Sequence, residues 1–145
     1  MATPVDSANL ILKLYELRRE PVMREARNTF MGFDPRSLED YMAGMMGPQS
    51  AHIRMVTSYW DMAASFVVNG AIDAAMFDDT NGEHILVFGK IEGFLPQLRQ
   101  AMGSPNMYKN LEQVCISAPG GLERVRATTE RIRGMMAQRS AATAK

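Results

Sequence analysis

Apolar residues in the middle of the chain recur every three or four positions, which is the spacing of one face of an α-helix. Between Pro48 and Asn69 this stripe consists of Ile53, Val56, Trp60, Ala63 and Val67. The stripe is wide, because Tyr59 and Phe66 lie beside it. A wide apolar stripe is typical of a helix that is contacted on several sides. The pattern therefore predicts a long central helix near residues 48–69.

A second long helical pattern covers residues 83–101. Its apolar positions are Ile85, Phe88, Ile91 and Leu95. Pro96 lies inside this pattern and lacks the N–H that a helix interior requires, so we expect a kinked helix. Gly89 and Gly93 are four residues apart and therefore share one face, where two missing side chains favour close approach of another helix.

Prolines, glycines and aspartates mark the ends of the other helices. Three predicted helix starts place an aspartate after an apolar residue, where its carboxylate can accept hydrogen bonds from the free N–H groups of the first turn. These starts are Val5-Asp6, Phe33-Asp34 and Ile72-Asp73. Further helices are predicted over 7–19, 21–31, 35–46 and 122–138, and from Ser104-Pro105 onward, and residues 78–82 are predicted to form a turn. In the first helix, Leu10, Leu14 and Leu17 form the expected apolar stripe.

No segment alternates apolar and polar residues over more than a few positions, so no strand is predicted. The expected fold is all-α: a single domain over residues 1–145, built as a bundle of about seven or eight helices. Residues 140–145 are small and polar and are expected to form a frayed tail.

The length and composition agree with a globular domain. A chain of 145 residues with 46% apolar and 22% charged residues can bury a hydrophobic core that is stable without disulfide bonds. Cys115 is the only cysteine, so an intramolecular disulfide is impossible and a cytoplasmic location is expected. No segment reaches the roughly 20 apolar residues that a membrane-spanning helix needs, so membrane insertion is not expected.

The net charge is zero, but the charges are unevenly distributed. Residues 34–92 contain nine acidic and three basic residues, and residues 93–145 contain three acidic and eight basic residues. Either the two regions face each other within one fold, or they mark a contact between copies. The 13 methionines leave a similar choice between core filling and a methionine-lined groove.

The residue types needed for catalysis do not occur in recognisable patterns. The two histidines, His52 and His84, lack the glutamate spacing of a di-iron site, and with Cys115 they do not make a zinc site. We expect both histidines to be surface or helix-end residues and Cys115 to be an inert residue on an apolar helix face. The sequence therefore predicts no catalytic residue, metal ligand or cofactor. The arginines near the C-terminus are not interleaved with aromatic residues, so nucleic-acid binding is not expected.

One group of side chains on the central helix could line a pocket. It consists of Met55, Tyr59, Trp60, Asp61 and Phe66. Methionine and aromatic side chains suit an apolar ligand, and a carboxylate such as Asp61 could take part in acid–base chemistry.

Parts of residues 59–112 resemble a family of small bacterial helical domains of unknown function. The similar segments are Tyr59-Trp60, Asn69-Gly70-Ala71-Ile72-Asp73, Val87-Phe88, Lys90-Ile91-Glu92, Leu95-Pro96, Leu98-Arg99, Pro105, Tyr108 and Asn110-Leu111-Glu112. The resemblance implies an all-helical fold and a bacterial cytoplasmic protein. Some of the family's members carry an N-terminal membrane anchor, which is not expected here. The resemblance supplies no catalytic residues.

Together these patterns favour a non-enzymatic protein-interaction module that self-associates as a homodimer or homo-oligomer. The alternative is a small-molecule sensor or carrier with an apolar pocket lined by methionine and aromatic residues. An enzyme is the third possibility.

Overall fold

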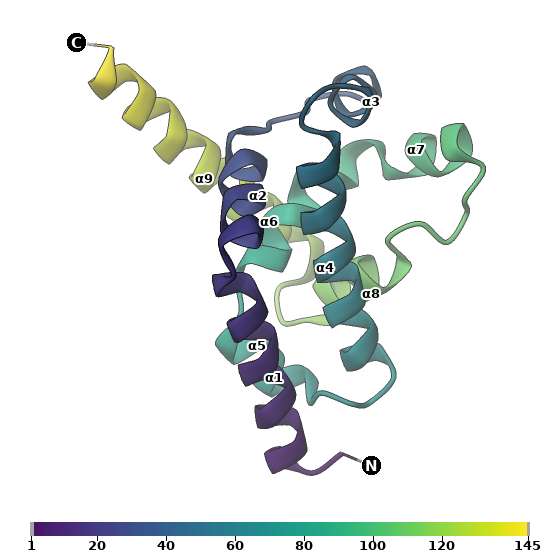
Figure 1. Ribbon diagram of the computed structural model, residues 1–145. Coiled ribbons are helices and arrows are strands. Elements are labelled where there is room, and N and C mark those ends of the chain that lie inside the picture. Colours follow the sequence, from purple (N-terminus) through teal and green to yellow (C-terminus); the bar gives the residue numbers. More distant parts are fainter. Residues whose placement is uncertain (1, 145) are drawn as a thin grey trace.

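The computed structural model describes residues 2–144, and these form a bundle of helices without a strand (Figure 1). The α-helices are α1 (Pro4–Arg19), α2 (Pro21–Gly32), α3 (Leu38–Met46), α4 (Ser50–Val68), α5 (Ala74–Thr80), α6 (Glu83–Gly89), α7 (Leu95–Met102), α8 (Lys109–Ser117) and α9 (Gly121–Thr143), with a 3-10 helix η1 (Glu92–Phe94) between α6 and α7. The predicted all-α, single-domain bundle is confirmed. Among residues 2–144, no helix combines the length and apolar composition that crossing a membrane requires.

The predicted central helix is α4. It packs against α2 on one side and α8 on another, and it also contacts α3, α5 and α6. Ile53, Val56, Trp60 and Ala63 of the predicted stripe are almost completely shielded from solvent, whereas Val67 is half-buried. The helix begins at Ser50 because Pro48 and Gln49 form a turn before it.

The predicted bent helix consists of α6, η1 and α7. Counted as one helix, as the sequence analysis does, this segment gives eight helices among the described residues. The bend lies at Lys90 and Ile91, ahead of Pro96. Pro96 instead occupies the first turn of α7, where the missing N–H costs no helical hydrogen bond.

Only one of the three predicted aspartate caps is correct. The Asp73 carboxylate accepts a hydrogen bond from the Met76 N–H at 2.9 Å and begins α5. Asp6 lies inside α1, because the Thr3 hydroxyl caps the helix and Asp6 hydrogen-bonds back to the Thr3 N–H. Asp34 lies in a loop, because its carboxylate is bound by arginines and Ser37 caps α3 instead.

Two further boundaries differ from the prediction. The segment 78–82 is not one turn, since α5 continues to Thr80 and only Asn81 and Gly82 separate it from α6. No helix begins at Ser104-Pro105, because the chain makes a turn there and α8 starts at Lys109. Tyr108 takes a left-handed conformation with φ of 58°, and its hydroxyl lies 2.7 Å from the Tyr41 hydroxyl. This buried tyrosine pair fixes the turn that precedes α8.

The buried face of α1 is only in part the predicted one. Leu14 faces the core as predicted, together with Ser7 and Ile11, whereas Leu10 and Leu17 are exposed. Only a narrow strip of α1 is therefore covered by the rest of the protein.

Helix α9 contacts α6 and α8, and ion pairs join it to the acidic part of the chain. Arg124 pairs with Asp78 at 2.8 Å, Arg126 with Glu92 at 3.1 Å and Arg133 with Asp34 at 2.8 Å. Contacts within one fold therefore account for much of the charge asymmetry. The last turns of α9 extend away from the body of the protein (Figure 1), and their side chains are exposed.

Of the two glycines that were expected to admit a neighbouring helix, Gly89 does so. A Cβ at Gly89 would lie 1.9 Å from the Thr129 Oγ1 of α9, whereas a Cβ at Gly93 would meet nothing within 4 Å. The absence of a side chain at Gly89 is thus what lets α9 approach α6.

These two glycines provide a matched stability test. Gly89→Ala should lower the free energy of unfolding by roughly 1–3 kcal/mol, because the added methyl group forces α6 and α9 apart. Gly93→Ala should leave the free energy of unfolding unchanged or raise it slightly, because the substitution only reduces the conformational freedom of the unfolded chain. Thermal and urea unfolding of both variants would measure the difference, and equal losses would show that α9 does not pack closely on Gly89.

Candidate functional site

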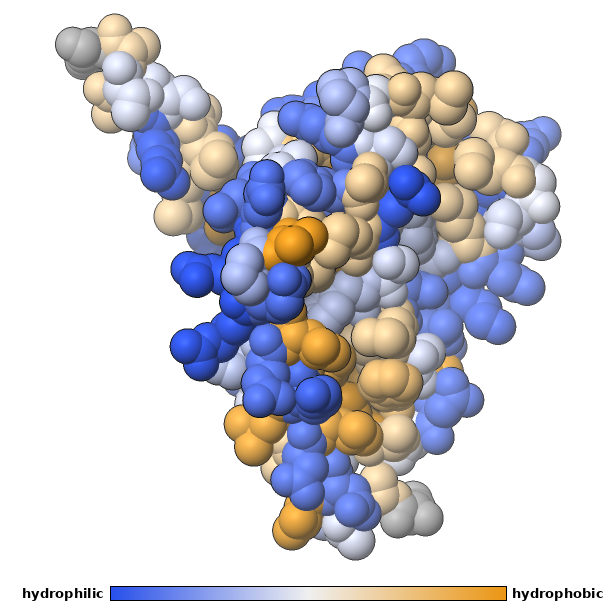
Figure 2. All heavy atoms as spheres, in the orientation of Figure 1, coloured by the Kyte–Doolittle hydropathy of each residue, from blue (hydrophilic) through white to orange (hydrophobic). Residues whose placement is uncertain are grey.

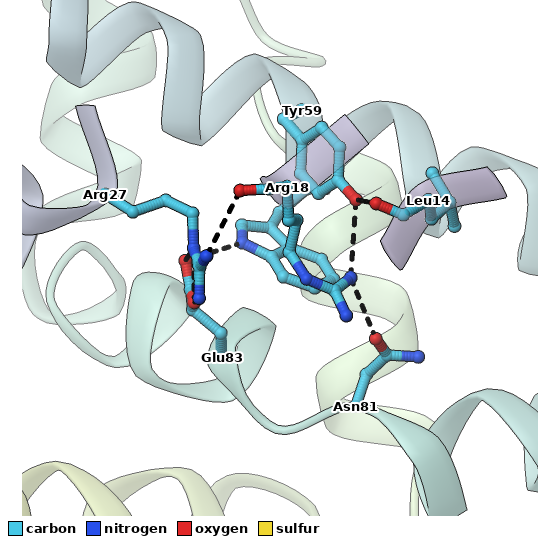
Figure 3. A network of polar contacts seen from close by, with 7 residues as sticks. Leu14, Arg18, Arg27, Tyr59, Asn81 and Glu83 are labelled. Atoms are coloured by element: carbon cyan, nitrogen blue, oxygen red, sulfur yellow. Dashed lines mark hydrogen bonds and ion pairs between the residues drawn. The ribbon is translucent and has the colours of Figure 1, made fainter. Parts of the chain in front are cut away.

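A network of polar side chains surrounds Trp60 on α4 (Figure 3). The Glu83 carboxylate, at the start of α6, accepts hydrogen bonds from Arg27 of α2 at 2.7–3.1 Å. It also accepts one from the Trp60 indole N–H at 3.3 Å. One carboxylate therefore joins three helices that are distant in sequence.

Arg18 connects α1 to the same network. Its guanidinium lies 5.0 Å from the centre of the Trp60 ring and donates hydrogen bonds to the Tyr59 hydroxyl and to the Asn81 side chain, at 3.3 and 3.1 Å. The Tyr59 hydroxyl in turn donates to the Leu14 carbonyl of α1. Figure 3 shows Arg18 reaching from α1 toward Tyr59 and Asn81. A cation over an aromatic face is favourable, so this contact holds α1 on α4.

The network's charged groups are engaged with one another, which limits the chemistry they can perform. Hydrogen bonding to Glu83 raises the pKa of Arg27, so this arginine remains charged. Burial raises the pKa of Tyr59, so its hydroxyl remains protonated and donates to a carbonyl. A general base or nucleophile needs a free, accessible group. These residues instead stabilise the packing of α1, α2 and α6 on α4.

His84 lies beside this network and is buried rather than on the surface. It does lie at a helix end, in the first turn of α6, but only 1% of it is exposed, and its ring contacts Phe77 and Trp60 at centroid distances of 4.8 and 5.7 Å. Among residues 2–144, neither ring nitrogen has a hydrogen-bond partner. Burial lowers the pKa of His84 to about 4, so the ring is neutral near pH 7. Its position within an apolar run is the only sequence signal for this burial.

Lys90 is a second buried polar residue, and no sequence pattern indicates its burial. Its ammonium donates to the carbonyls of Phe30, Met31 and Phe33 at 2.6–3.1 Å, at the end of α2. Burial lowers the pKa of Lys90 to about 8, while the three carbonyl acceptors favour its charged form. The lysine therefore caps α2 from the bend between α6 and α7.

The residues that were expected to line a pocket do not converge on one cavity. Trp60 is 1% exposed and packs edge-on against Tyr59 and Phe77. Asp61 points the other way, accepts the Leu111 N–H at 3.0 Å, and lines an open pocket beside α8. Met55 and Phe66 pack against the core as partly buried side chains.

The remaining candidate ligands do not form a metal centre. In the part of the chain that the structure describes, no three His, Cys, Asp or Glu side chains are grouped so that they could hold a metal ion. His52 hydrogen-bonds with Thr29 at 2.8 Å, and Cys115 is buried with its pKa raised to about 12 by burial. A thiol in this environment is a weak nucleophile.

The comparisons with known proteins identify a family but no activity. A family model described as a domain of unknown function, DUF4760, matches residues 4–117, so the chain belongs to this family. No curated protein and no solved structure matches the chain. The match spans α1 to α8, and α9 lies beyond it.

The structural role of the Trp60 network can be tested by removing one charge. Glu83→Gln keeps the size of the side chain but leaves Arg27 without its partner, so we expect a loss of roughly 1–3 kcal/mol in the free energy of unfolding. Glu92→Gln removes the Arg126 partner, an arginine that is largely exposed, and should have a smaller effect. Urea unfolding would measure the free energy of unfolding of both variants. An equal loss in the two would contradict the role of Glu83 in holding α2, α4 and α6 together.

Protonation of His84 should destabilise the fold in acid. The histidine pKa is about 4 in the folded protein against 6.5 for an unperturbed histidine, so the unfolded chain binds the proton first as the pH falls. Stability attributable to His84 is therefore complete above pH 6.5, decreases between pH 6.5 and 4, and is reduced by about 3 kcal/mol below pH 4. Unfolding experiments across this range should show a shallower pH dependence for His84→Leu than for the wild type. Equal pH dependence for the two proteins would contradict this role of His84.

Proposed function

We propose that this member of the DUF4760 family is a non-enzymatic interaction module that associates with a second copy of itself through the outer face of α1. The observation that carries the proposal is the exposure of large apolar side chains on this helix. Val5, Leu12 and Tyr15 are 68, 63 and 51% exposed. A group of exposed apolar side chains on one surface is a common mark of a protein-interaction site.

The exposed residues are arranged as a helical stripe. They are Val5, Leu12 and Tyr15, with the half-buried Ala8 between the first two. Spacings of three, four and three residues place all four on one side of α1. The stripe lies apart from the buried strip of Ser7, Ile11 and Leu14. Figure 2 shows apolar side chains gathered over the α1 and α2 region of this face, with charged side chains between them.

Other exposed apolar residues lie outside the stripe. Leu10 and Leu17 lie on the other side of α1, and Val22, at the start of α2, is 51% exposed. The stripe itself belongs to a helix whose N-terminal part lies at one end of the molecule (Figure 1). A surface helix of this kind can pack in two-fold symmetric fashion against the same helix of another copy.

Two other features support a second copy as the partner. The net charge of zero leaves little repulsion between identical chains. The charged side chains around Trp60 are engaged within the fold, which favours a binding role over catalysis. A cytoplasmic setting, with Cys115 kept reduced, is part of this proposal.

Sedimentation velocity over a micromolar to millimolar concentration series tests the proposal. The wild type should form a dimer, and added salt should not dissociate it because the contact is apolar. Leu12→Glu places a charge in the interface and should weaken dimerisation by about tenfold or more, equivalent to about 1.4 kcal/mol.

Met46→Glu is the matched control, because Met46 is 84% exposed but lies at the end of α3. It should leave the dimer unchanged. A wild-type protein that is monomeric throughout the series would refute the proposal, and so would equal effects of the two glutamate substitutions.

A further inference from the structure

An apolar pocket lies between the ends of α4, α5 and α8. Its volume is about 400 Å³, which is within the usual range for small-molecule sites. Most of its wall is aliphatic. The lining residues are Val67, Val68, Ala74, Ala75, Val114, Ala118 and Pro119, together with the polar Asp78, Asp79, Gln113 and Ser117.

The electrostatic environment of this pocket is negative. Val67 and Val68 are the last residues of α4, and Ser117 is the last residue of α8, so two helix C-termini border the pocket. Ala74 and Ala75 also bring the N-terminus of the seven-residue α5 to the pocket, but the Asp73 carboxylate already caps it. The C-terminal end of a helix carries a partial negative charge. Two carboxylates in the last turn of α5, Asp78 and Asp79, add to it. A positively charged ligand is therefore favoured over a neutral or anionic one.

The two carboxylates are not equivalent. Asp78 pairs with Arg124 of α9 at 2.8 Å, so its charge is largely compensated. Asp79 is exposed and, among residues 2–144, has no cation within ion-pair distance. A carboxylate in the last turn of a helix is electrostatically unfavourable unless a cation lies close to it. Asp79 is therefore available to a ligand.

The other residues that line the pocket indicate which kind of cation it can bind. A metal ion is disfavoured because the pocket offers two carboxylates, one of them already paired, and a mostly aliphatic wall. A quaternary ammonium ion is usually held by aromatic side chains, and the lining contains none. A primary ammonium can donate hydrogen bonds to a carboxylate while its hydrocarbon part contacts aliphatic side chains.

We infer that this pocket binds a small organic cation, namely a primary amine with a short aliphatic body, whose ammonium group pairs with Asp79 and whose hydrocarbon part lies against Val67 and Val114. This ligand site does not depend on the proposed self-association. Arg124 of α9 donates a hydrogen bond to Asp78, which also lines this pocket. A bound ligand would therefore lie next to the contact between α5 and α9.

The test uses four probes with the same six-carbon chain: hexylammonium, hexyltrimethylammonium, 1-hexanol and hexanoate. Methyl resonances of Val67, Ala75 and Val114 are followed by NMR during titration of the full-length protein. Hexylammonium should shift these resonances saturably and bind about tenfold more tightly than the other three probes, because only it combines the charge with hydrogen-bond donors.

Three variants at exposed positions locate the binding. Asp79→Asn should remove the preference for hexylammonium over 1-hexanol, whereas Glu25→Gln, an exposed carboxylate on α2, should retain it. Ala75→Leu should fill part of the pocket and weaken binding of every probe that the wild type binds. Three outcomes would overturn the inference: no saturable shift with hexylammonium, equal affinity for the ammonium and the alcohol, or equal effects of Asp79→Asn and Glu25→Gln.

Discussion

The Glu83 carboxylate, bound by Arg27 and by the Trp60 indole, is the contact on which the arrangement of the N-terminal half depends. It joins α2 and α6 to the central helix α4, and the Arg18 guanidinium adds α1 by stacking on the same tryptophan. Hydrogen bonds to a shared carboxylate are directional, whereas apolar packing alone would allow α1 and α2 to rotate or slide. The network therefore determines which face of α1 turns toward solvent.

This constraint explains why one apolar side of α1 is buried while another is exposed to solvent. Arg18 follows Ser7, Ile11 and Leu14 at helical spacing, so the polar anchor and the buried strip lie on the same side of the helix. Val5, Leu12 and Tyr15 are then left on the outside. The proposed self-association makes use of this surface, and the proposed amine site lies elsewhere, between α4, α5 and α8.

Much of the fold could be predicted from the sequence, because helical periodicity and strong local signals determine it. The central helix, the bent segment and the Asp73 cap all follow from short-range patterns. The predictions for Asp6 and Asp34 were wrong because a nearby hydroxyl caps each helix and, at Asp34, two arginines bind the carboxylate. Arg133 is 99 residues away from Asp34 in the sequence, so no local pattern indicates this contact.

The polar contacts of the core were the least predictable. Lys90 and His84 occur within an apolar run, but whether a polar residue there is buried depends on what the fold brings next to it. The α2 carbonyls that bind Lys90 lie about 60 residues earlier in the chain. The Trp60 network combines residues from α1, α2, α4 and α6 in the same way, so only the folded chain reveals it.

If two copies of the chain associate through the outer face of α1, as proposed, side chains on that face change environment as the protein concentration rises. NMR spectra of the unmodified protein over a concentration series would detect this change. We expect concentration-dependent shifts for Val5, Leu12 and Tyr15, whereas Met46 and Met135, on α3 and α9, should be unchanged. Shifts confined to α9, or spectra that do not change with concentration, would rule out the α1 interface.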